Sequence, residues 1–177
     1  MVNLNPKPLT LNPKLIIGLG NPDKKYLNTH HNVGLIFIKY LKDQNPYSLP
    51  YTLLASNTYM NESGKFVVKE LKKSGAPPEA LLIVHDDSDI ELGKYKLSFG
   101  RGSAGHHGIE SIQTTLKTKD FWRLRIGIRP INPIGPVNRR PKAGDFVLKK
   151  ISSENKKILE KVFQEIIKKI KEEKNPA

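Results

Sequence analysis

The sequence predicts a single three-layer α/β domain with a twisted, mostly parallel mixed sheet flanked by helices. Two short aliphatic runs, Leu15–Ile17 and Leu81–Val84, have the length and apolar character of buried parallel strands, and each is followed by a polar turn. Segments with apolar residues at helical spacing alternate with these and other strand-like segments, which is the pattern of an α/β domain. The chain has 177 residues, of which 37% are hydrophobic, so it can bury a full core.

The first half of the chain supplies two strands and two helices. Leu15–Ile17 ends in the turn sequence Gly18-Leu19-Gly20-Asn21-Pro22. Val33–Leu41 has apolar residues at positions 33, 36, 37, 40 and 41, which predicts a helix. A strand is expected at Tyr51–Ala55. Asn61–Lys73 is expected to be a helix, because a Gly-Ala-Pro-Pro sequence follows it closely and ends it.

The second half continues the alternation. Leu81–Val84 is a buried strand that we expect to end in His85-Asp86-Asp87. A final amphipathic helix is expected to begin at Ser152/Ser153, which offer an N-cap. Alternating or helical apolar spacing predicts the other elements, which are a strand at 95–99, a helix at 109–116, a strand at 123–128 and the continuation of the last helix to 170. The proline-rich segment 129–144 is expected to be a loop.

Composition narrows the class of protein. Residues 1–13 contain three prolines and no apolar run, so we expect a flexible N-terminal extension without a secretory signal, followed by one domain over 14–177. No run approaches the ~18 apolar residues of a membrane span, and no membrane partner is expected. The absence of cysteine excludes a disulfide scaffold, a thiol nucleophile and cysteine-bound zinc. These features predict a cytoplasmic protein.

Positive charge is concentrated in one part of the chain. The net charge is +13, and residues 94–142 carry eleven basic residues against two acidic ones, while residues 1–93 are nearly neutral. Such a one-sided field is typical of a protein that binds a polyanion. We therefore predict a nucleic-acid partner, although a lysine-rich composition also serves solubility. Lys94, Arg101 and Arg123 are candidate contacts.

His31 and Asp86 are candidates for a catalytic pair. His31 lies where a helix is expected to begin, and Asp86 follows a buried strand, so both can lie at the carboxyl edge of the sheet. A carboxylate that bonds one imidazole nitrogen fixes the tautomer and leaves the other nitrogen to accept a proton from water. Nearby Asn21, Asn32 and Asn61 could direct amides into the same crevice, although each is also a common turn or cap residue.

Three other interpretations of these segments are open. Gly18-Leu19-Gly20 invites a dinucleotide-binding interpretation, but Asp23 occupies the third glycine position and Pro22 interrupts the turn. His31, His85-Asp86 and Asp89 have side chains that could be metal ligands, and their spacing does not exclude such a site. We nevertheless expect no bound metal. The glycine-rich segment Gly100–Gly108 is either a phosphate-binding loop or an ordinary surface loop.

Four ordered blocks of the sequence resemble the bacterial peptidyl-tRNA hydrolase family. They are G-L-G-N-P with Y-x-x-T-x-H-N-x-G over Gly18–Gly34, Y-M-N-E-S-G over Tyr59–Gly64, H-D-D-S-D over His85–Asp89, and G-x-x-G-H-x-G-I over Gly102–Ile109 followed by R-L-R-I-G-I over Arg123–Ile128. With the segments between them, the blocks cover roughly residues 15–148. The resemblance implies an enzyme that hydrolyses the ester between a peptide and tRNA and so recycles tRNA.

The resemblance also implies roles for individual residues. His31 would be the general base, Asp86 would orient it, and Asn61 would stabilise the oxyanion. The substrate-binding residues would be Asn21, Tyr26, Tyr59 and His107. The implied partner is the acceptor end of peptidyl-tRNA, and we expect a monomer that needs no cofactor.

Several positions depart from the family pattern. His107 replaces an asparagine, His30 replaces an arginine and Asp23 replaces a glycine, while the segment 41–59 and the tail after Ile170 are shorter than usual. An alternative from another class is therefore a catalytically weak relative that binds RNA without turnover. Retention of His31, Asp86, Asn21 and Asn61 favours the enzyme.

Overall fold

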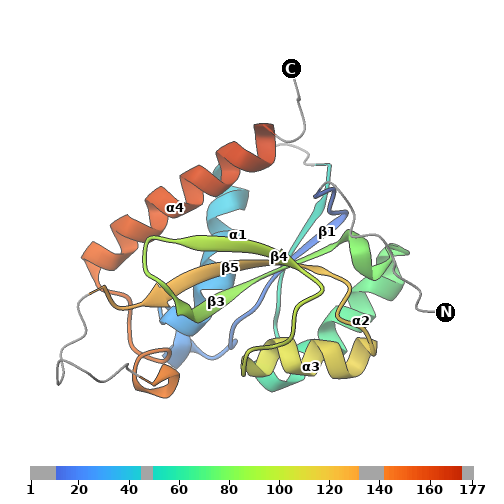
Figure 1. Cartoon of the computed structure of the whole chain (residues 1–177), viewed down its shortest axis with the longest axis horizontal. Coiled ribbons are helices and arrows are strands. Elements are labelled where there is room, and N and C mark those ends of the chain that lie inside the picture. The colour runs from blue at the N-terminus through green and yellow to red at the C-terminus, as the bar shows by residue number, and fades with distance from the viewer. Residues whose placement is uncertain (1–10, 45–49, 132–141, 173–177) are drawn as a thin grey trace.

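Five strands form one mixed sheet in the order β2-β1-β3-β5-β4 (Figure 1). The computed structural model describes residues 11–44, 50–131 and 142–172. The strands are β1 (Leu15–Gly18), β2 (Thr52–Ala55), β3 (Leu81–Glu91), β4 (Tyr95–Phe99) and β5 (Trp122–Arg129). β2, β1, β3 and β5 run parallel to one another, whereas β4 is antiparallel to β5 at one edge. The predicted fold class, a single α/β domain with a mostly parallel sheet, is confirmed.

Helices cover both faces of this sheet and complete the three layers (Figure 1). They are α1 (Val33–Gln44), α2 (Ser63–Ser74), α3 (His107–Leu116) and α4 (Ser153–Glu172). Apolar residues of α1 and α4 share one core cluster with Ile16, Leu82 and Val84 of the sheet. Residues of α2 and α3 pack in a second cluster against the alternate side chains of the same strands. The alternation of side chains along each strand therefore divides the core into two layers.

The last helix forms as its sequence predicts. Ser152 caps α4, since its Oγ accepts a hydrogen bond from the backbone N–H of Asn155 at 3.2 Å. The apolar stripe of α4 then packs against α1, where the ring of Phe163 meets that of Phe37 edge-on at 5.2 Å. This contact fixes the position of α1 over the sheet.

β3 is longer than we predicted, and its extra length carries Asp86 past the end of β1. The strand continues through Asp86 to Glu91, where we expected it to end at His85-Asp86-Asp87. Its pairing with β1 stops at Val84, whereas its pairing with β5 continues. β1 leads on to β2 at one edge of the sheet, whereas β3 leads on to β4 at the other edge. The carboxyl ends of β1 and β3 therefore form the switch point where α/β proteins place their sites. Asp86 therefore lies within a strand that has lost one neighbour.

The predicted ends of two segments also need correction. Leu11 packs against the first core cluster and Pro13 is buried, so residues 11–13 belong to the packed domain, while residues 1–10 of the expected extension lie outside the described residues. β5 includes Arg129, the first residue of the expected loop, and residues 132–141 of that loop lie outside the described residues as well. Within the described ranges, no helix is both long and apolar enough to cross a membrane.

Candidate active site

A close approach of α1 to the sheet places His31 beside β3. A Cβ atom added to Gly34, in the first turn of α1, would lie 2.4 Å from the carbonyl oxygen of Val84 and 2.6 Å from that of Leu19. Only glycine allows this distance, because real side chains need more room. His31 lies in the short 3-10 turn His30–Asn32 that leads into α1, so it meets β3 just beyond Val84.

The backbone of this turn is held by a segment far along the chain. The N–H of His31 donates to the carbonyl of Val147 at 2.8 Å, and that of His30 donates to the carbonyl of Lys149 at 3.2 Å. The buried ring of His30 also bonds the Lys149 carbonyl through Nδ1, at 3.1 Å. Burial lowers the pKa of His30, which favours its neutral form. The His30–Asn32 turn is therefore fixed by main-chain contacts as well as by packing.

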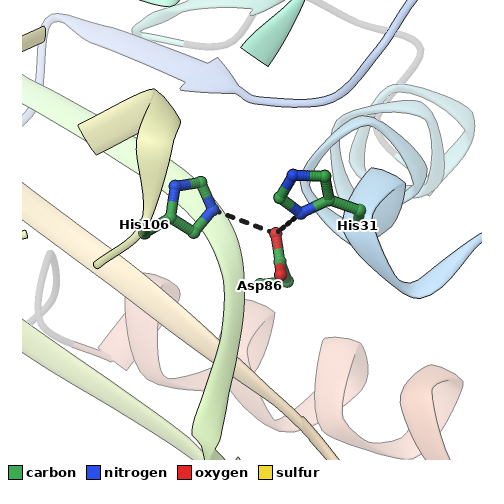
Figure 2. A group of neighbouring side chains, drawn as sticks. All are labelled: His31, Asp86 and His106. Atoms are coloured by element: carbon green, nitrogen blue, oxygen red, sulfur yellow. Dashed lines mark hydrogen bonds and ion pairs between the residues drawn. The ribbon is translucent and has the colours of Figure 1, made fainter. Parts of the chain in front are cut away.

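His31 and Asp86 form the predicted pair (Figure 2). The Nδ1 of His31 lies 2.9 Å from Oδ1 of Asp86, and the two residues are 55 positions apart in sequence. The Asp86 side chain is 3% exposed and that of His31 is 15% exposed, so the carboxylate is shielded while the imidazole reaches the surface. Because Nδ1–H donates to the carboxylate, Nε2 carries the lone pair and can accept a proton.

A second histidine, His106, binds the same carboxylate oxygen. Its Nε2 lies 3.0 Å from Oδ1 of Asp86, on the opposite side from His31 (Figure 2). His106 is also the N-cap of α3, since Nδ1 accepts from the backbone N–H groups of Gly108 and Ile109 at 3.2 and 3.4 Å. An accepting Nδ1 has no proton, so the neutral ring carries its proton on Nε2 and donates it to Asp86.

These contacts determine the charges in the site. Burial disfavours the ionised form of Asp86, but the electrostatic attraction and the hydrogen bonds of His106 and His31 outweigh burial and hold the Asp86 pKa well below its usual range. Burial would lower the pKa of His31, yet the hydrogen bond and the negative charge of Asp86 raise it above the usual 6.5. Asp86 is therefore a carboxylate that increases the basicity of His31.

His85 is buried beside the site and packs against His106. It is 1% exposed, and its ring packs edge-on against that of His106, with centroids 4.5 Å apart. Its Nδ1 donates to the backbone carbonyl of Asp86 at 2.6 Å, and burial keeps its pKa well below the usual value. This neutral ring fixes both the strand at Asp86 and the ring of His106.

The alternatives that involve a metal or a dinucleotide fit these contacts poorly. The donor atoms of His31, Asp86 and His106 lie within 4.8 Å of one another, but His85 and Asp89 do not join this group. A metal bound to Nε2 of His106 would need the proton on Nδ1, where it would oppose the N–H groups at the start of α3. The loop after β1 leads into the 3-10 turn Lys24–Tyr26, so it does not present a pyrophosphate to the N-terminus of a helix.

Asparagine side chains connect the loop after β1 with the turns that precede α1 and α2. Asn32 binds the backbone of Asn21 twice, accepting from its N–H at 2.8 Å and donating to its carbonyl at 2.9 Å. The Oδ1 of Asn21 in turn accepts from the N–H of Met60 at 2.9 Å, which leaves its Nδ2 as a donor. Asn61, in the 3-10 turn Met60–Glu62, is exposed, and its side chain makes no hydrogen bond with the described residues. Its amide is available to a ligand.

Comparison with known proteins identifies the family. A family model described as peptidyl-tRNA hydrolase matches residues 15–50 and 47–173. The chain is 38% identical over 166 residues to a peptidyl-tRNA hydrolase of Sulfurihydrogenibium sp., with 85% of each chain covered. Against the peptidyl-tRNA hydrolase of Thermodesulfovibrio yellowstonii it is 37% identical over 171 residues, with 86% of this chain and 88% of the relative covered.

The fold agrees with this match. The crystal structure of peptidyl-tRNA hydrolase from Acinetobacter baumannii superposes with a TM-score of 0.75 at 33% identity, over 92% of this chain and 89% of that chain. The chain belongs to the peptidyl-tRNA hydrolase family. Members of this family release tRNA from peptidyl-tRNA, and the enzymatic class predicted from the motifs is confirmed at the level of the family.

The aromatic residues that the peptidyl-tRNA hydrolase motifs predict as substrate contacts lie in the loops after β1 and before α2. Tyr26 is half-buried in the 3-10 turn after β1, and Tyr59 is 44% exposed beside Met60. Tyr59 reaches across to Asp23 and donates to its carboxylate at 2.8 Å. His107, which stands in place of the asparagine of the family, has a side chain 78% exposed with Nδ1 3.8 Å from Glu110. His107 and His106 are adjacent in sequence, yet only His106 joins the carboxylate.

The three predicted tRNA contacts have different surroundings. Lys94 is exposed before β4, and its carbonyl accepts from the N–H of Gly127, near the carboxyl end of β5. Arg101 is also exposed but follows the opposite end of β4. Arg123 is only 2% exposed, and burial lowers its pKa to about 10. We predicted Arg123 as a tRNA contact from the positive charge of residues 94–142, but β5 is covered on both faces, so Arg123 is not a surface contact.

His106 is the site residue that sequence reasoning missed. It lies in the glycine-rich segment of the peptidyl-tRNA hydrolase motif G-x-x-G-H-x-G-I, which we interpreted as a phosphate loop or a surface loop. The usable signal was its position three residues before the helix expected at 109–116, close to where a side-chain acceptor caps the first turn. Its second bond, to Asp86, depends on tertiary structure and has no signature in the sequence.

Proposed function

We propose that this chain hydrolyses the ester between the peptide and the 3′ ribose of peptidyl-tRNA, releasing free tRNA and free peptide. The observation that carries the proposal is the 2.9 Å bond between Nδ1 of His31 and Oδ1 of Asp86, which leaves Nε2 free to accept a proton. Membership of the peptidyl-tRNA hydrolase family supports the choice of substrate.

Water is the nucleophile in the proposed reaction. Nε2 of His31 takes a proton from a water molecule as its oxygen attacks the ester carbonyl, and the imidazolium that forms is stabilised by the Asp86 carboxylate. The carbonyl oxygen becomes an oxyanion. The exposed amide of Asn61 donates to that oxygen, because it has no competing hydrogen bond with the described residues.

Collapse of the tetrahedral intermediate completes the reaction. The bond between the carbonyl carbon and the ribose 3′ oxygen breaks, and the proton held on His31 passes to that oxygen as it leaves. The products are a peptide carboxylic acid, which ionises in water, and a tRNA with a free 3′ hydroxyl. His31 returns to its neutral form, so the cycle needs neither metal nor cofactor.

Substrate binding in this proposal uses side chains of the loops after β1 and before α2 and of the start of α3. The Nδ2 of Asn21 holds the ester end, Tyr26 and Tyr59 contact the tRNA acceptor end, and His107 contacts the substrate beside α3. Lys94 and Arg101 attract the phosphates of the tRNA. The proposal further places the enzyme in the cytoplasm, where translation supplies peptidyl-tRNA, and treats it as a monomer because one chain carries all of these groups.

Cleavage of N-acetylated aminoacyl-tRNA tests the proposal. Release of the N-acetyl amino acid from the tRNA by the purified chain is expected, with free aminoacyl-tRNA as the control for the N-blocked ester. Tight binding of the tRNA without any release would instead favour the alternative of an RNA-binding relative without turnover.

A further inference from the structure

Asp23 joins Tyr26 and Tyr59, the two aromatic residues of the loops after β1 and before α2. Its Oδ2 accepts a hydrogen bond from the hydroxyl of Tyr59 at 2.8 Å, and the Nζ of Lys25 lies 3.9 Å from the same oxygen. Lys25 Nζ also lies over the ring of Tyr26, 4.9 Å from its centroid. One carboxylate oxygen therefore links Tyr59 directly and Tyr26 through Lys25.

This link joins two separate loops. Asp23 follows β1, whereas Tyr59 precedes α2, and the two residues are 36 positions apart. The same loops are joined beneath by the bond from the Met60 N–H to Oδ1 of Asn21. The inner bond is buried, while the Asp23–Tyr59 bond lies at the surface, with Tyr59 44% exposed and the Asp23 side chain 40% exposed. The outer link thus leaves much of Tyr59 open to a ligand.

A tyrosine on a surface loop normally samples several orientations, and binding to it then costs rotamer entropy. The hydrogen bond to Asp23 restricts the Tyr59 side chain before any ligand arrives. It also raises the pKa of the Tyr59 phenol, because the neutral hydroxyl is the donor to the carboxylate. Tyr59 is thereby held as a neutral ring that can stack with a base.

We propose that Asp23 is a positioning residue that holds the Tyr59 ring ready for the acceptor end of the tRNA and so strengthens substrate binding. The inference rests on the proposed function. It assigns a role to a carboxylate at a position where the family motif has glycine. Without this role, a negative charge beside a polyanion binding site only weakens binding.

The test compares two neutral replacements of Asp23. Asp23→Asn keeps an acceptor for the Tyr59 hydroxyl, whereas Asp23→Ala removes it, and both remove the same charge. We expect Asp23→Ala to have a KM about two- to fivefold above that of Asp23→Asn, the scale of one exposed hydrogen bond, with kcat similar in both. In a Tyr59→Phe background the two replacements should have the same KM, because phenylalanine has no hydroxyl to donate.

Asp43 provides the matched control. It is an exposed carboxylate on α1 that binds Lys39 at 2.6 Å, so its Ala and Asn variants have the same charge change without touching Tyr59. These two variants should have equal KM values. A second readout is the phenolate absorbance of Tyr59 in a pH titration, taken as the difference from Tyr59→Phe. Its pKa should fall in Asp23→Ala.

The outcomes separate this inference from the proposed function. If the wild type releases peptide but Asp23→Ala and Asp23→Asn have equal KM values, the positioning role is wrong and the function stands. A lower KM for Asp23→Ala than for Asp23→Asn would also overturn it, since the contact would then be a barrier to binding. An inactive wild type would instead refute the proposed function.

Discussion

Nε2 of His106 lies 3.0 Å from Oδ1 of Asp86, so the residue that begins α3 is bonded to a carboxylate in the middle of β3. The other ring nitrogen of His106 caps the helix, which means that one neutral imidazole satisfies both a helix N-terminus and a buried charge. Helix stability and the charge of the site therefore depend on the same side chain.

His106→Asn separates these two roles. Asparagine is a good N-cap but is too short to replace the bond to Asp86, so the free energy of unfolding should stay closer to the wild type than that of His106→Ala, which loses the cap at a cost of about 0.5–2 kcal/mol. Denaturant unfolding measures this difference. In both variants the carboxylate loses a donor and becomes a stronger acceptor for His31, so the acid limb of kcat/KM should move to higher pH. An unmoved limb in both would show that His106 does not influence His31.

His31→Ala tests the general base. Its loss should lower the rate of peptidyl-tRNA hydrolysis by about 10²-fold or more, the usual scale of general-base catalysis. The measurement is single-turnover cleavage of N-acetylated aminoacyl-tRNA, with circular dichroism to check that the variant is folded. Near-normal turnover of a folded His31→Ala variant would end the assignment of His31 as the base.

Asp86→Asn should change the pH dependence of the reaction. The base must be neutral, so the rate falls as pH drops through the pKa of His31, which Asp86 raises above 6.5. Asparagine has no charge, so the pKa of His31 should fall and the acid limb of kcat/KM should move to lower pH. The plateau should fall less than in His31→Ala, because the base remains. A limb that moves to higher pH in Asp86→Asn would contradict this account.

The sequence predicted the pair His31 and Asp86 because strand and helix boundaries alone place both at one edge of a parallel sheet. It predicted the length of β3 poorly, because the polar run His85-Asp86-Asp87 resembles a turn, and only pairing with β5 keeps it extended. Arg123 of β5 was wrongly predicted as an RNA contact, because its charge does not show in the sequence that the side chain is buried. Alternation indicates two faces, but it does not show that helices bury both.

Replacing Lys94 or Arg101 should affect tRNA binding, whereas replacing Arg123 should affect stability. Replacing Lys94 or Arg101 with alanine should raise KM and leave kcat nearly unchanged, since these exposed charges bind ground and transition states alike. Each loss should also reduce the salt slope of tRNA binding by about one if the residue neutralises one phosphate. Arg123→Ala should instead lower the free energy of unfolding, by about 1–3 kcal/mol, because the side chain is buried. Binding that does not vary with salt would show that these charges do not face the RNA.

Removal of metals should leave the activity intact. The proton of His106 is on Nε2, and His31 uses its own Nδ1–H on the same carboxylate, so both nitrogens nearest Asp86 are donors and not ligands. After prolonged dialysis against a chelator, the enzyme should cleave its substrate at the original rate once Mg²⁺ is supplied for the tRNA. Loss of activity that stoichiometric zinc or manganese restores would establish a metal site.

The support of His31 by Val147 and Lys149 has a consequence for the order in which the enzyme is made. A nascent chain that has emerged only as far as β5 carries His31, Asp86 and His106, but it lacks the carbonyls that hold the backbone of the base. While the chain is being synthesised, it is itself a peptide esterified to tRNA. Translation therefore delivers the last support of His31, the proposed base, late, and a half-made chain is poorly equipped to cut the ester that still attaches it to the ribosome.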